Sequence, residues 1–200
     1  MTIQNRKERE RAEREKLIIT AARELAEAEG WEAVTTRRLA ERVEYSQPVL
    51  YSHFKGKGAI MTAVALEGFA ELAAELREAR MAAPDPAQAL ARVGAAYVAF
   101  ADRRPALYDA MFRQSVDLPF ATPETPAALR AGFEEFTEAL RPHLRAPHLA
   151  GADPGPLAET FWAALHGLAT LMRGGRLPRE HHDTRLTLLL ACFTHQPTPR

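Results

Sequence analysis

The sequence contains a single cysteine, Cys192, so an intrachain disulfide is excluded. A chain without disulfides is typical of a reducing compartment. Cys192 lies in an apolar run near the C-terminus, where we expect an ordinary buried thiol. No apolar run approaches the ~18–20 residues that a membrane span needs, and no apolar signal segment follows the charged N-terminus. We therefore expect a cytoplasmic protein that does not bind membranes.

The sequence also lacks the patterns of catalytic and metal sites. It has no nucleophile–base–orienter spacing and no glycine-rich phosphate loop. His181, His182 and Asp183 are adjacent in the sequence, but neighbouring residues on a helix do not face one site. We interpret this segment as a solvated polar turn. The sequence thus predicts no catalytic residue, no metal and no cofactor.

Charge is balanced over the whole chain and unbalanced locally. The 26 basic and 26 acidic residues give a formal net charge of zero, so the overall charge does not attract the chain to nucleic acid. Residues 33–60, however, carry five basic side chains and only two acidic ones. A local basic patch of this kind can dock on phosphates. Residues 1–14 have mixed charge and no apolar stripe, which favours a flexible arm; the alternative is an arm that touches DNA.

Hydrophobic periodicity predicts an all-α protein with about nine helices and no strand. An apolar stripe starts at Leu17 and ends before Gly30, and Pro142 should kink or end a later helix early. The expected helices cover approximately residues 17–29, 36–43, 47–53, 59–81, 87–102, 106–116, 127–145, 157–172 and 183–194.

The segment from Thr35 to Lys57 has the spacing of a helix-turn-helix. Two short helices, 36–43 and 47–53, flank the residues 44–46, which is about the turn length that this motif needs. Thr35 or Thr36 and then Ser46 are suitable N-cap residues, and Pro48 falls in the first turn of its helix, where a missing N–H costs little.

The side chains of the second helix suit the major groove of DNA. Gln47 can bond adenine in a bidentate manner, Pro48 and Val49 can pack on thymine methyls, and Ser52 can bond phosphate or base. Tyr51, His53 and Lys57 lie near its far end, where a helix that leaves the groove meets the DNA backbone. Thr35, Thr36 and Arg37 begin the preceding helix, where exposed N–H groups favour phosphate.

These residues also resemble a known family. The pattern Thr35-x-x-x-Leu39-Ala40, then Tyr45-Ser46, then Leu50-Tyr51-x-His53-Phe54-x-x-Lys57 is similar to the DNA-binding domain of TetR-family transcriptional regulators. The segment 161–167, with Trp162, His166 and Gly167, resembles the Trp-His-Gly segment of one C-terminal subgroup of that family.

The resemblance implies a homodimer that binds operator DNA and a small effector. It implies a DNA-binding domain over residues 1–58 and a ligand-binding and dimerisation domain over 59–200. By position, phosphate contacts fall on Thr35, Thr36, Ser46, Tyr51, His53 and Lys57, and base contacts fall on Gln47, Pro48, Val49 and Ser52. The turn departs from the family, because Glu44 stands where glycine is usual. If Glu44 has a positive φ, it costs roughly 1 kcal/mol relative to glycine.

Aromatic side chains between residues 69 and 172 are candidates for an effector pocket, although most fall at helical spacing and are equally explained as core. Those with a polar tip in apolar surroundings are the best candidates. The predicted pocket residues are Tyr97, Phe100, Tyr108, Met111, Phe112, Phe133, Trp162 and His166.

The last two predicted helices are unusually apolar. Their stripe is wider than one core face needs, which favours a four-helix interface with a second copy; a helix pair buried within one subunit is the alternative. The predicted interface residues are Leu165, Leu168, Leu171, Met172, Leu186, Leu189, Leu190 and Phe193.

These features predict a ligand-responsive repressor that is released from a near-palindromic operator by a small effector. An activator or a regulator that ignores ligand would have the same motif. The alternative from a different functional class is a helical small-molecule-binding protein or enzyme without a DNA role. That alternative does not explain the basic helix-turn-helix segment.

Overall fold

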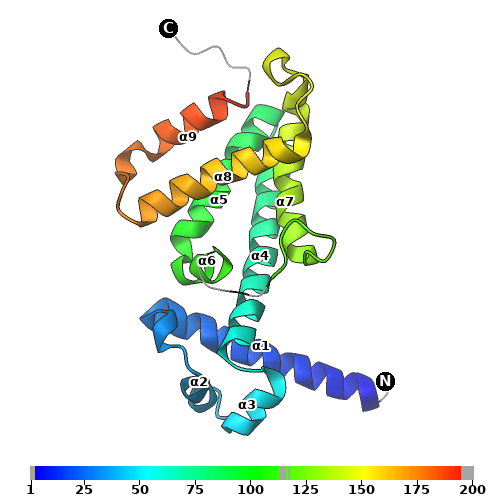
Figure 1. Cartoon of the computed structure of the whole chain (residues 1–200), viewed down its shortest axis with the longest axis vertical. Coiled ribbons are helices and arrows are strands. Elements are labelled where there is room, and N and C mark those ends of the chain that lie inside the picture. Colours follow the sequence, from blue (N-terminus) through cyan, green and yellow to red (C-terminus); the bar gives the residue numbers. More distant parts are fainter. Residues whose placement is uncertain (1–2, 113–115, 117, 195–200) are drawn as a thin grey trace. The chain divides into compact units, whose positions relative to one another are not determined.

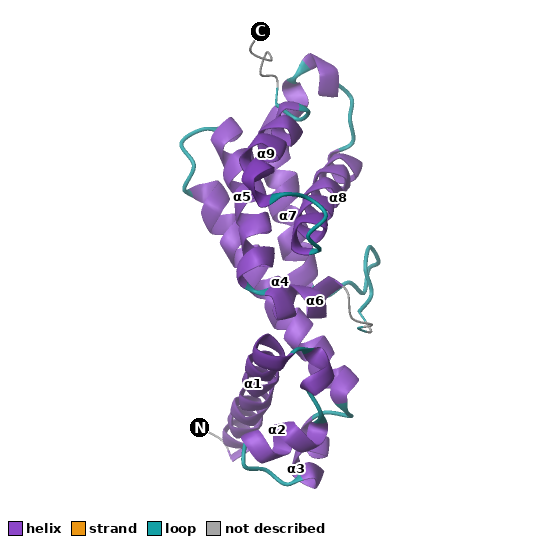
Figure 2. Cartoon of the chain, turned by 90° about the vertical axis from the view of Figure 1, so that its left-hand side faces the viewer, coloured by secondary structure: helices purple, strands orange, loops and turns teal. Residues whose placement is uncertain are grey.

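The computed structural model describes residues 3–112, 116 and 118–194. Within these residues the chain contains nine α-helices and four short 3-10 helices and forms no strand (Figure 2). The α-helices are α1 (Ile3–Glu29), α2 (Thr36–Arg42), α3 (Gln47–His53), α4 (Lys57–Met81), α5 (Pro86–Arg103), α6 (Pro105–Phe112), α7 (Ala127–Leu140), α8 (Pro154–Arg173) and α9 (His182–Ala191). The 3-10 helices are η1 (Trp31–Ala33), η2 (Arg141–Arg145), η3 (Pro147–Leu149) and η4 (Arg179–His181).

The all-α fold predicted from the sequence is confirmed, and the helix ends differ by a few residues. Three prolines begin helices, at Pro86, Pro105 and Pro154, because a missing N–H costs nothing in the first turn. The helix expected over 127–145 ends at Leu140, and Pro142 lies in the 3-10 turn that follows it. The expected helix 106–116 ends at Phe112, and residues 113–115 lie outside the described part of the chain.

The chain divides into two compact units. The first comprises residues 1–68 and 104–125, and the second comprises residues 69–103 and 126–200. Helix α4 contributes its first half to one unit and its second half to the other. These units are defined by packing and not by function, so the functional division expected after residue 58 remains a prediction.

The first unit packs α1, α2, α3, α6 and the first half of α4 around a small apolar core (Figure 1). Ile18, Leu39, Leu50, Ile60 and Val64 are almost fully buried there. Gly68 on α4 allows a close approach of α6, since a Cβ at this position would lie 2.7 Å from Sδ of Met111.

Two expectations differ from the structure. Residues 3–14 were expected to form a flexible arm, yet they belong to helix α1, and residues 4–14 are exposed. Ion pairs within this helix, such as Arg6 with Glu10 and Arg11 with Glu15, support it without an apolar stripe. Cys192 was expected to be buried, yet it follows the last turn of α9 and is exposed.

The second unit packs α5, α7, α8 and α9 around a core that is rich in aromatic rings. Tyr97 lies edge-on to Phe136 with ring centroids 5.7 Å apart, and Phe161 lies 5.1 Å from Phe193. Gly94 lets α5 approach both C-terminal helices, because a Cβ there would lie 3.2 Å from Leu186 and 3.5 Å from Leu165.

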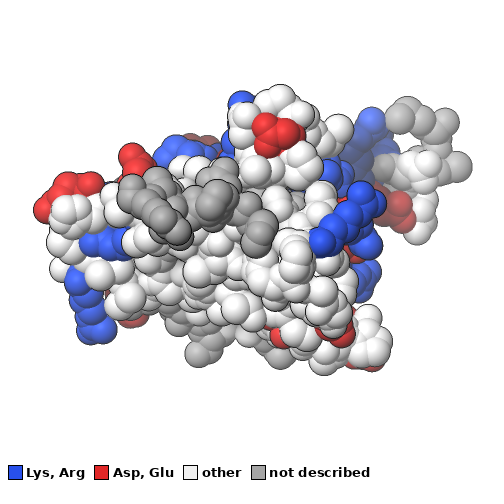
Figure 3. Space-filling model, turned by 90° about the horizontal axis from the view of Figure 1, so that it is seen from above, with Lys and Arg blue, Asp and Glu red and all other residues white. Residues whose placement is uncertain are grey.

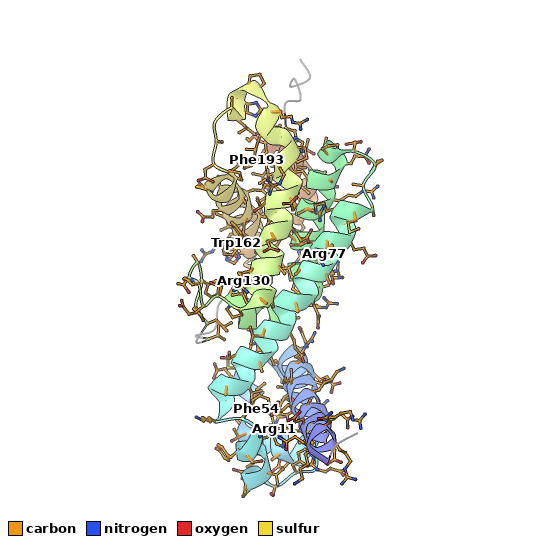
Figure 4. The ribbon with its side chains drawn as sticks, turned by 90° about the vertical axis from the view of Figure 1, so that its right-hand side faces the viewer. Arg11, Phe54, Arg77, Arg130, Trp162 and Phe193 are labelled. Carbon is orange, nitrogen blue, oxygen red and sulfur yellow. The ribbon has the colours of Figure 1, made fainter. Side chains whose placement is uncertain are left out.

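An ion-pair cluster joins α4 to α7 in the second unit. Glu135 is 3% exposed, and its carboxylate accepts Nε–H of Arg77 at 2.8 Å and Nε–H of Arg80 at 2.7 Å (Arg77 is labelled in Figure 4). Such a pair is stabilising only while its partners remain in place, since an unpaired buried carboxylate is costly.

Candidate nucleic-acid interface and ligand-binding cluster

The turn between α2 and α3 is a Schellman motif with an unusual residue at its centre. Tyr45 donates its N–H to the carbonyl of Ala40 at 2.9 Å, and Glu44 donates to Glu41 at 3.3 Å. This pattern requires a left-handed residue after the helix end, and Glu44 has φ 57°. Glycine is the usual residue in that conformation, so the turn carries strain of roughly 1 kcal/mol at Glu44.

The beginnings of the two helices differ in how they are capped. The Thr35 side chain accepts the N–H of Arg38 at 3.2 Å, so it is the N-cap of α2. Ser46 stands at the N-cap position of α3 but makes no capping hydrogen bond through its side chain. Its carbonyl accepts the N–H of Leu50 at 3.1 Å, and Pro48 occupies the first turn.

One side of α3 is buried and the other is presented to solvent. Leu50 is fully buried and anchors the helix on the core. The exposed side chains of α3 are Gln47, Pro48, Val49, Tyr51 and Ser52. Tyr51 is 51% exposed, and its hydroxyl lies 3.4 Å from Oγ1 of Thr36 on α2, which brings together two of the predicted phosphate-binding groups.

His53 and Lys57, both predicted to contact phosphates, have partners within the protein. The side chain of His53 is 6% exposed, and its Nδ1 lies 3.4 Å from the carboxylate of Glu15 on α1. The ammonium group of Lys57 donates to the backbone carbonyl of Trp31 at 2.6 Å. The sequence motif alone did not reveal these contacts, because both partners come from the segment that precedes the helix-turn-helix.

Ion pairs divide the arginines of α2 between structural and exposed roles. Arg38 donates two hydrogen bonds, of 2.7 and 2.8 Å, to the carboxylate of Glu29 on α1. This hydrogen bonding lowers the pKa of Glu29. Arg42 pairs with Glu24 at 2.8 Å. Arg37 pairs only with Glu41 on its own helix among the described residues and remains strongly exposed. Of the three, Arg37 is therefore the one placed for an external anion.

The predicted ligand-binding residues fall into two groups, one in each unit. In the second unit, the indole N–H of Trp162 donates to the hydroxyl of Tyr97 at 3.0 Å, and that hydroxyl lies 3.2 Å from Nδ1 of His166. Nε2 of His166 lies 3.4 Å from Oγ1 of Thr170, a member of this cluster that the sequence did not suggest. Phe100 is fully buried in the same unit, and Phe133 is half-buried.

The Tyr97 hydroxyl links the two other side chains of this cluster. Its oxygen accepts from Trp162, and the same hydroxyl lies within hydrogen-bond distance of Nδ1 of His166. Burial lowers the pKa of His166, which favours its neutral form.

The remaining predicted pocket residues lie in the first unit. Tyr108 and Met111 are almost fully buried, and the rings of Tyr108 and Phe112 are 4.7 Å apart. A shallow hollow of about 340 Å³ also lies in this unit, beside Trp31. Its lining includes three acidic residues that were not predicted from the sequence as site residues, Glu27, Glu32 and Asp109.

The predicted interface leucines are only partly available to a partner. Leu165, Met172, Leu186 and Phe193 are buried within the chain, so a second copy is not needed to cover them. Leu168, Leu189 and Leu190 are half-buried, and Leu171 is 38% exposed. Leu188, which was not among the predicted residues, is 61% exposed.

Two other features limit the chemistry of the described part of the chain. It contains no group of three or more His, Cys, Asp or Glu side chains that could hold a metal ion. None of its helices combines the length and the apolar character needed to cross a bilayer.

Comparison with known proteins places both parts of the chain in one group. Residues 18–64 match the model of bacterial regulatory proteins of the tetR family, and residues 90–193 match the model of the tetracyclin repressor-like C-terminal domain. The second match alone covers more than half of the chain.

Individual relatives match over shorter segments or at lower identity. The class C tetracycline repressor protein of Escherichia coli is 52% identical over 48 residues, which are 24% of this chain and 22% of that protein. The uncharacterized HTH-type regulator YobS of Bacillus subtilis (strain 168) is 30% identical over 96 residues, 48% of this chain and 50% of the relative. This chain therefore matches half or less of the length of these relatives.

A solved structure agrees over nearly the full length. A protein of unknown function from Rhodococcus sp. RHA1 is 26% identical with a TM-score of 0.74, and the alignment covers 90% of this chain and 92% of that one.

Proposed function

Since the chain belongs to the TetR family of bacterial regulatory proteins, we propose that it is a repressor that binds operator DNA as a homodimer and is released by a small effector. In this proposal the protein works in the cytoplasm and performs no catalytic step. Helix α3 reads the major groove, and the cluster around Tyr97 in the second unit contacts the effector.

The exposed face of α3 is the observation that supports DNA binding most strongly. Gln47, Val49 and Ser52 are exposed together, while Leu50 holds the helix from the other side. These side chains offer an amide, an apolar surface and a hydroxyl, which are the groups that contact base edges. Tyr51, Thr36 and Arg37 lie beside them and are proposed to bind phosphates, as are Thr35 and Ser46.

His53 and Lys57 have a more specific place in the proposal. Each is held by a partner in the first unit, so each contacts DNA only if it exchanges that partner for a phosphate. The Lys57 ammonium group can do this by rotating its flexible side chain, which costs one hydrogen bond to Trp31. We propose that Lys57 binds phosphate in the complex and that His53 supports α3 from behind.

A homodimer supplies the second recognition helix. Dimeric helix-turn-helix proteins place their two recognition helices about 34–36 Å apart, one turn of DNA, and so read a near-palindromic site. Leu168, Leu171, Leu189 and Leu190 keep exposed surface on α8 and α9, and Leu188 adds more. Figure 3 shows a face of the molecule with a broad area in which Lys, Arg, Asp and Glu are scarce. Exposed leucines such as Leu171 and Leu188 favour a protein partner.

The effector is proposed to bind at the cluster of Tyr97, Trp162 and His166. These side chains place polar atoms among the rings of Phe136 and Phe161, which is the composition of small-molecule sites. An effector that binds one arrangement of the dimer more tightly than the DNA-binding arrangement lowers operator affinity by the ratio of its two affinities.

A binding assay tests the DNA part of the proposal. The duplex would be chosen by the wild-type protein from a randomised pool, and its dissociation constant would be measured by fluorescence anisotropy. Tyr51→Ala should weaken binding about tenfold, because it removes a backbone contact at the centre of the interface. Gln47→Ala should relax the preference for one base pair by roughly 1–3 kcal/mol.

Thr20→Ala is the control, because Thr20 is exposed on α1 and carries no proposed contact. It should bind as the wild type does. If the wild type selects no sequence from the pool, or if Tyr51→Ala and Gln47→Ala bind like the control, helix α3 is not a recognition helix.

A further inference from the structure

The first half of helix α1 continues a face that is buried in the second half. In the second half, Ile18, Ala21 and Leu25 form a row on the core of the first unit, and all three are buried. Their spacing, three and four residues, keeps them on one side of the helix. Toward the N-terminus the same spacing leads to Arg14, Arg11 and Lys7. The row is therefore apolar where it packs and basic where it extends beyond the core.

This basic row is free to meet an anion. Residues 4–14 are all exposed, and Lys7 and Arg14 form no ion pair or hydrogen bond within the described part of the chain. Arg11 donates Nε–H to Glu15 at 2.8 Å and still exposes 60% of its side chain (Arg11 is labelled in Figure 4). Glu10 lies three residues after Lys7 and four before Arg14, so it borders the row, and it is paired with Arg6. Glu15 is paired with Arg11.

Helix α3 fixes where the row lies relative to the DNA-binding surface. Glu15 contacts His53, the last residue of α3, so that end of α3 lies level with residue 15 of α1. Figure 1 shows α1 running past α2 and α3, with its N-terminal end extending beyond them. At 1.5 Å per residue, Lys7 to Arg14 span about 10 Å of helix beyond this point. A DNA strand carries a phosphate about every 3.4 Å along its axis, so three basic residues can reach neighbouring phosphates.

We propose that Lys7, Arg11 and Arg14 bind the sugar–phosphate backbone of the duplex that flanks the operator half-site. This proposal rests on the proposed function, because it assumes that α3 enters the adjacent major groove. The contact carries no sequence information. It lengthens the DNA segment that each protomer covers and strengthens binding to long duplexes relative to a minimal operator.

The chain supplies its own matched control. Arg9 and Lys16 lie on the opposite face of α1, which continues into exposed Thr20, and Arg6 lies on the flank between the two faces. Each set contains two arginines and one lysine, and each includes one arginine in an ion pair with a glutamate four residues later. The triple variants K7Q/R11Q/R14Q and R6Q/R9Q/K16Q therefore change the net charge equally, and glutamine preserves helix propensity.

The experiment measures binding of each protein to two duplexes at several salt concentrations. Both contain the site selected by the wild type, and one has eight further base pairs at each end. The wild type should bind the long duplex at least tenfold more tightly. On that duplex, a plot of log affinity against log salt concentration should be steeper for the wild type than for K7Q/R11Q/R14Q. The two slopes should differ by about 1 for each phosphate that the variant no longer binds. R6Q/R9Q/K16Q should keep both the preference for length and the slope.

Each result has a defined meaning. If the wild type binds both duplexes equally, or if the two triple variants lose the same affinity, the basic row does not contact flanking DNA, while specific binding to the operator still supports the proposed function. If the wild type binds no specific site, the proposed function itself fails. Far-ultraviolet circular dichroism checks that both variants keep the helix content of the wild type.

Discussion

The indole N–H of Trp31 donates to the backbone carbonyl of Ala106, 75 residues further along the chain, at 2.8 Å. Close by, the carboxylate of Glu27 accepts the backbone N–H groups of Leu107 at 3.2 Å and of Ala106 at 3.3 Å. The unpaired N–H groups at the start of helix α6 are thus satisfied by a residue of α1. A side chain near the C-terminal end of α1 thus caps a helix that follows α5 in the sequence.

Removal of this cap should destabilise the first unit. Glu27→Ala leaves the two N–H groups without their acceptor, and we expect the free energy of unfolding to fall by about 1 kcal/mol. The measurement is urea denaturation followed by circular dichroism. Glu13→Ala is the control, since Glu13 is exposed on the same helix and makes the same change of residue without touching α6. An equal loss in both variants would show that the cap does not stabilise the unit.

The turn at Glu44 should become more stable with glycine. Because Glu44 has φ 57°, Glu44→Gly removes the strain of a left-handed side-chain-bearing residue. We expect the free energy of unfolding to rise by about 0.5–1 kcal/mol, as the relief of strain exceeds the added entropy of the unfolded chain. Glu44→Ala should give no such gain, because alanine keeps the strained conformation. If Glu44→Ala raised the free energy of unfolding as much as Glu44→Gly, loss of the Glu44 charge and not relief of backbone strain would be the cause.

The ion pairs of Glu135 should respond unequally to single and double substitution. Arg77→Met leaves Glu135 paired with Arg80, and should lower the free energy of unfolding only slightly. The double variant R77M/R80M leaves a buried carboxylate unpaired, and should cost ~3 kcal/mol or more. Chemical denaturation of the single and double variants measures this difference. Arg141→Met, in an exposed pair with Glu138, should leave stability nearly unchanged. If the losses measured for Arg77→Met and Arg80→Met add up to the loss of the double variant, the two arginines do not act through a shared carboxylate.

Because of His166, the protein should be less stable in acid. Burial lowers the pKa of folded His166, so the unfolded chain binds the proton more tightly. The free energy of unfolding should therefore decrease as the pH falls below the ordinary histidine value of about 6.5, and should level off below the lowered value.

Thermal melts between pH 7.5 and pH 5 measure this dependence. His166→Gln should flatten it, because glutamine does not titrate. Tyr97→Phe should lower stability by about 1 kcal/mol at pH 7.5, as it leaves the Trp162 N–H without its acceptor. If wild type and His166→Gln lose stability in parallel between these pH values, another group is responsible.

Local signals in the sequence predicted much of the helix-turn-helix. The bounds of α3 were predicted correctly, since Pro48 can stand only in a first turn and Leu50 repeats the apolar pattern. The positive φ that glycine usually supplies in this turn is present at Glu44, as the family pattern implied. By contrast, residues 3–14 show no apolar period, and the helix there is visible only as repeated charge pairs.

Contacts between distant segments could not be predicted in the same way. The burial of His53 depends on Glu15, 38 residues earlier, and Lys57 is directed to a carbonyl 26 residues earlier. Tyr97, Trp162 and His166 were selected for their polar tips, and they do meet in one cluster. Which of these side chains bond to one another depends on how α5 packs against α8, and hydrophobic periodicity does not determine that packing. The burial of Leu165 and Leu186 within the chain has the same origin.

The exposed thiol of Cys192 makes the natural sequence suitable for distance measurements. Because it is the chain's single cysteine, a maleimide-linked nitroxide attaches at one place, just beyond α9, without any substitution. In a homodimer with two-fold symmetry the two labels define one distance, which pulsed electron paramagnetic resonance can measure. A monomer would give no dipolar signal. Addition of operator DNA or of a candidate effector would then show directly whether the C-terminal helices of the two protomers move.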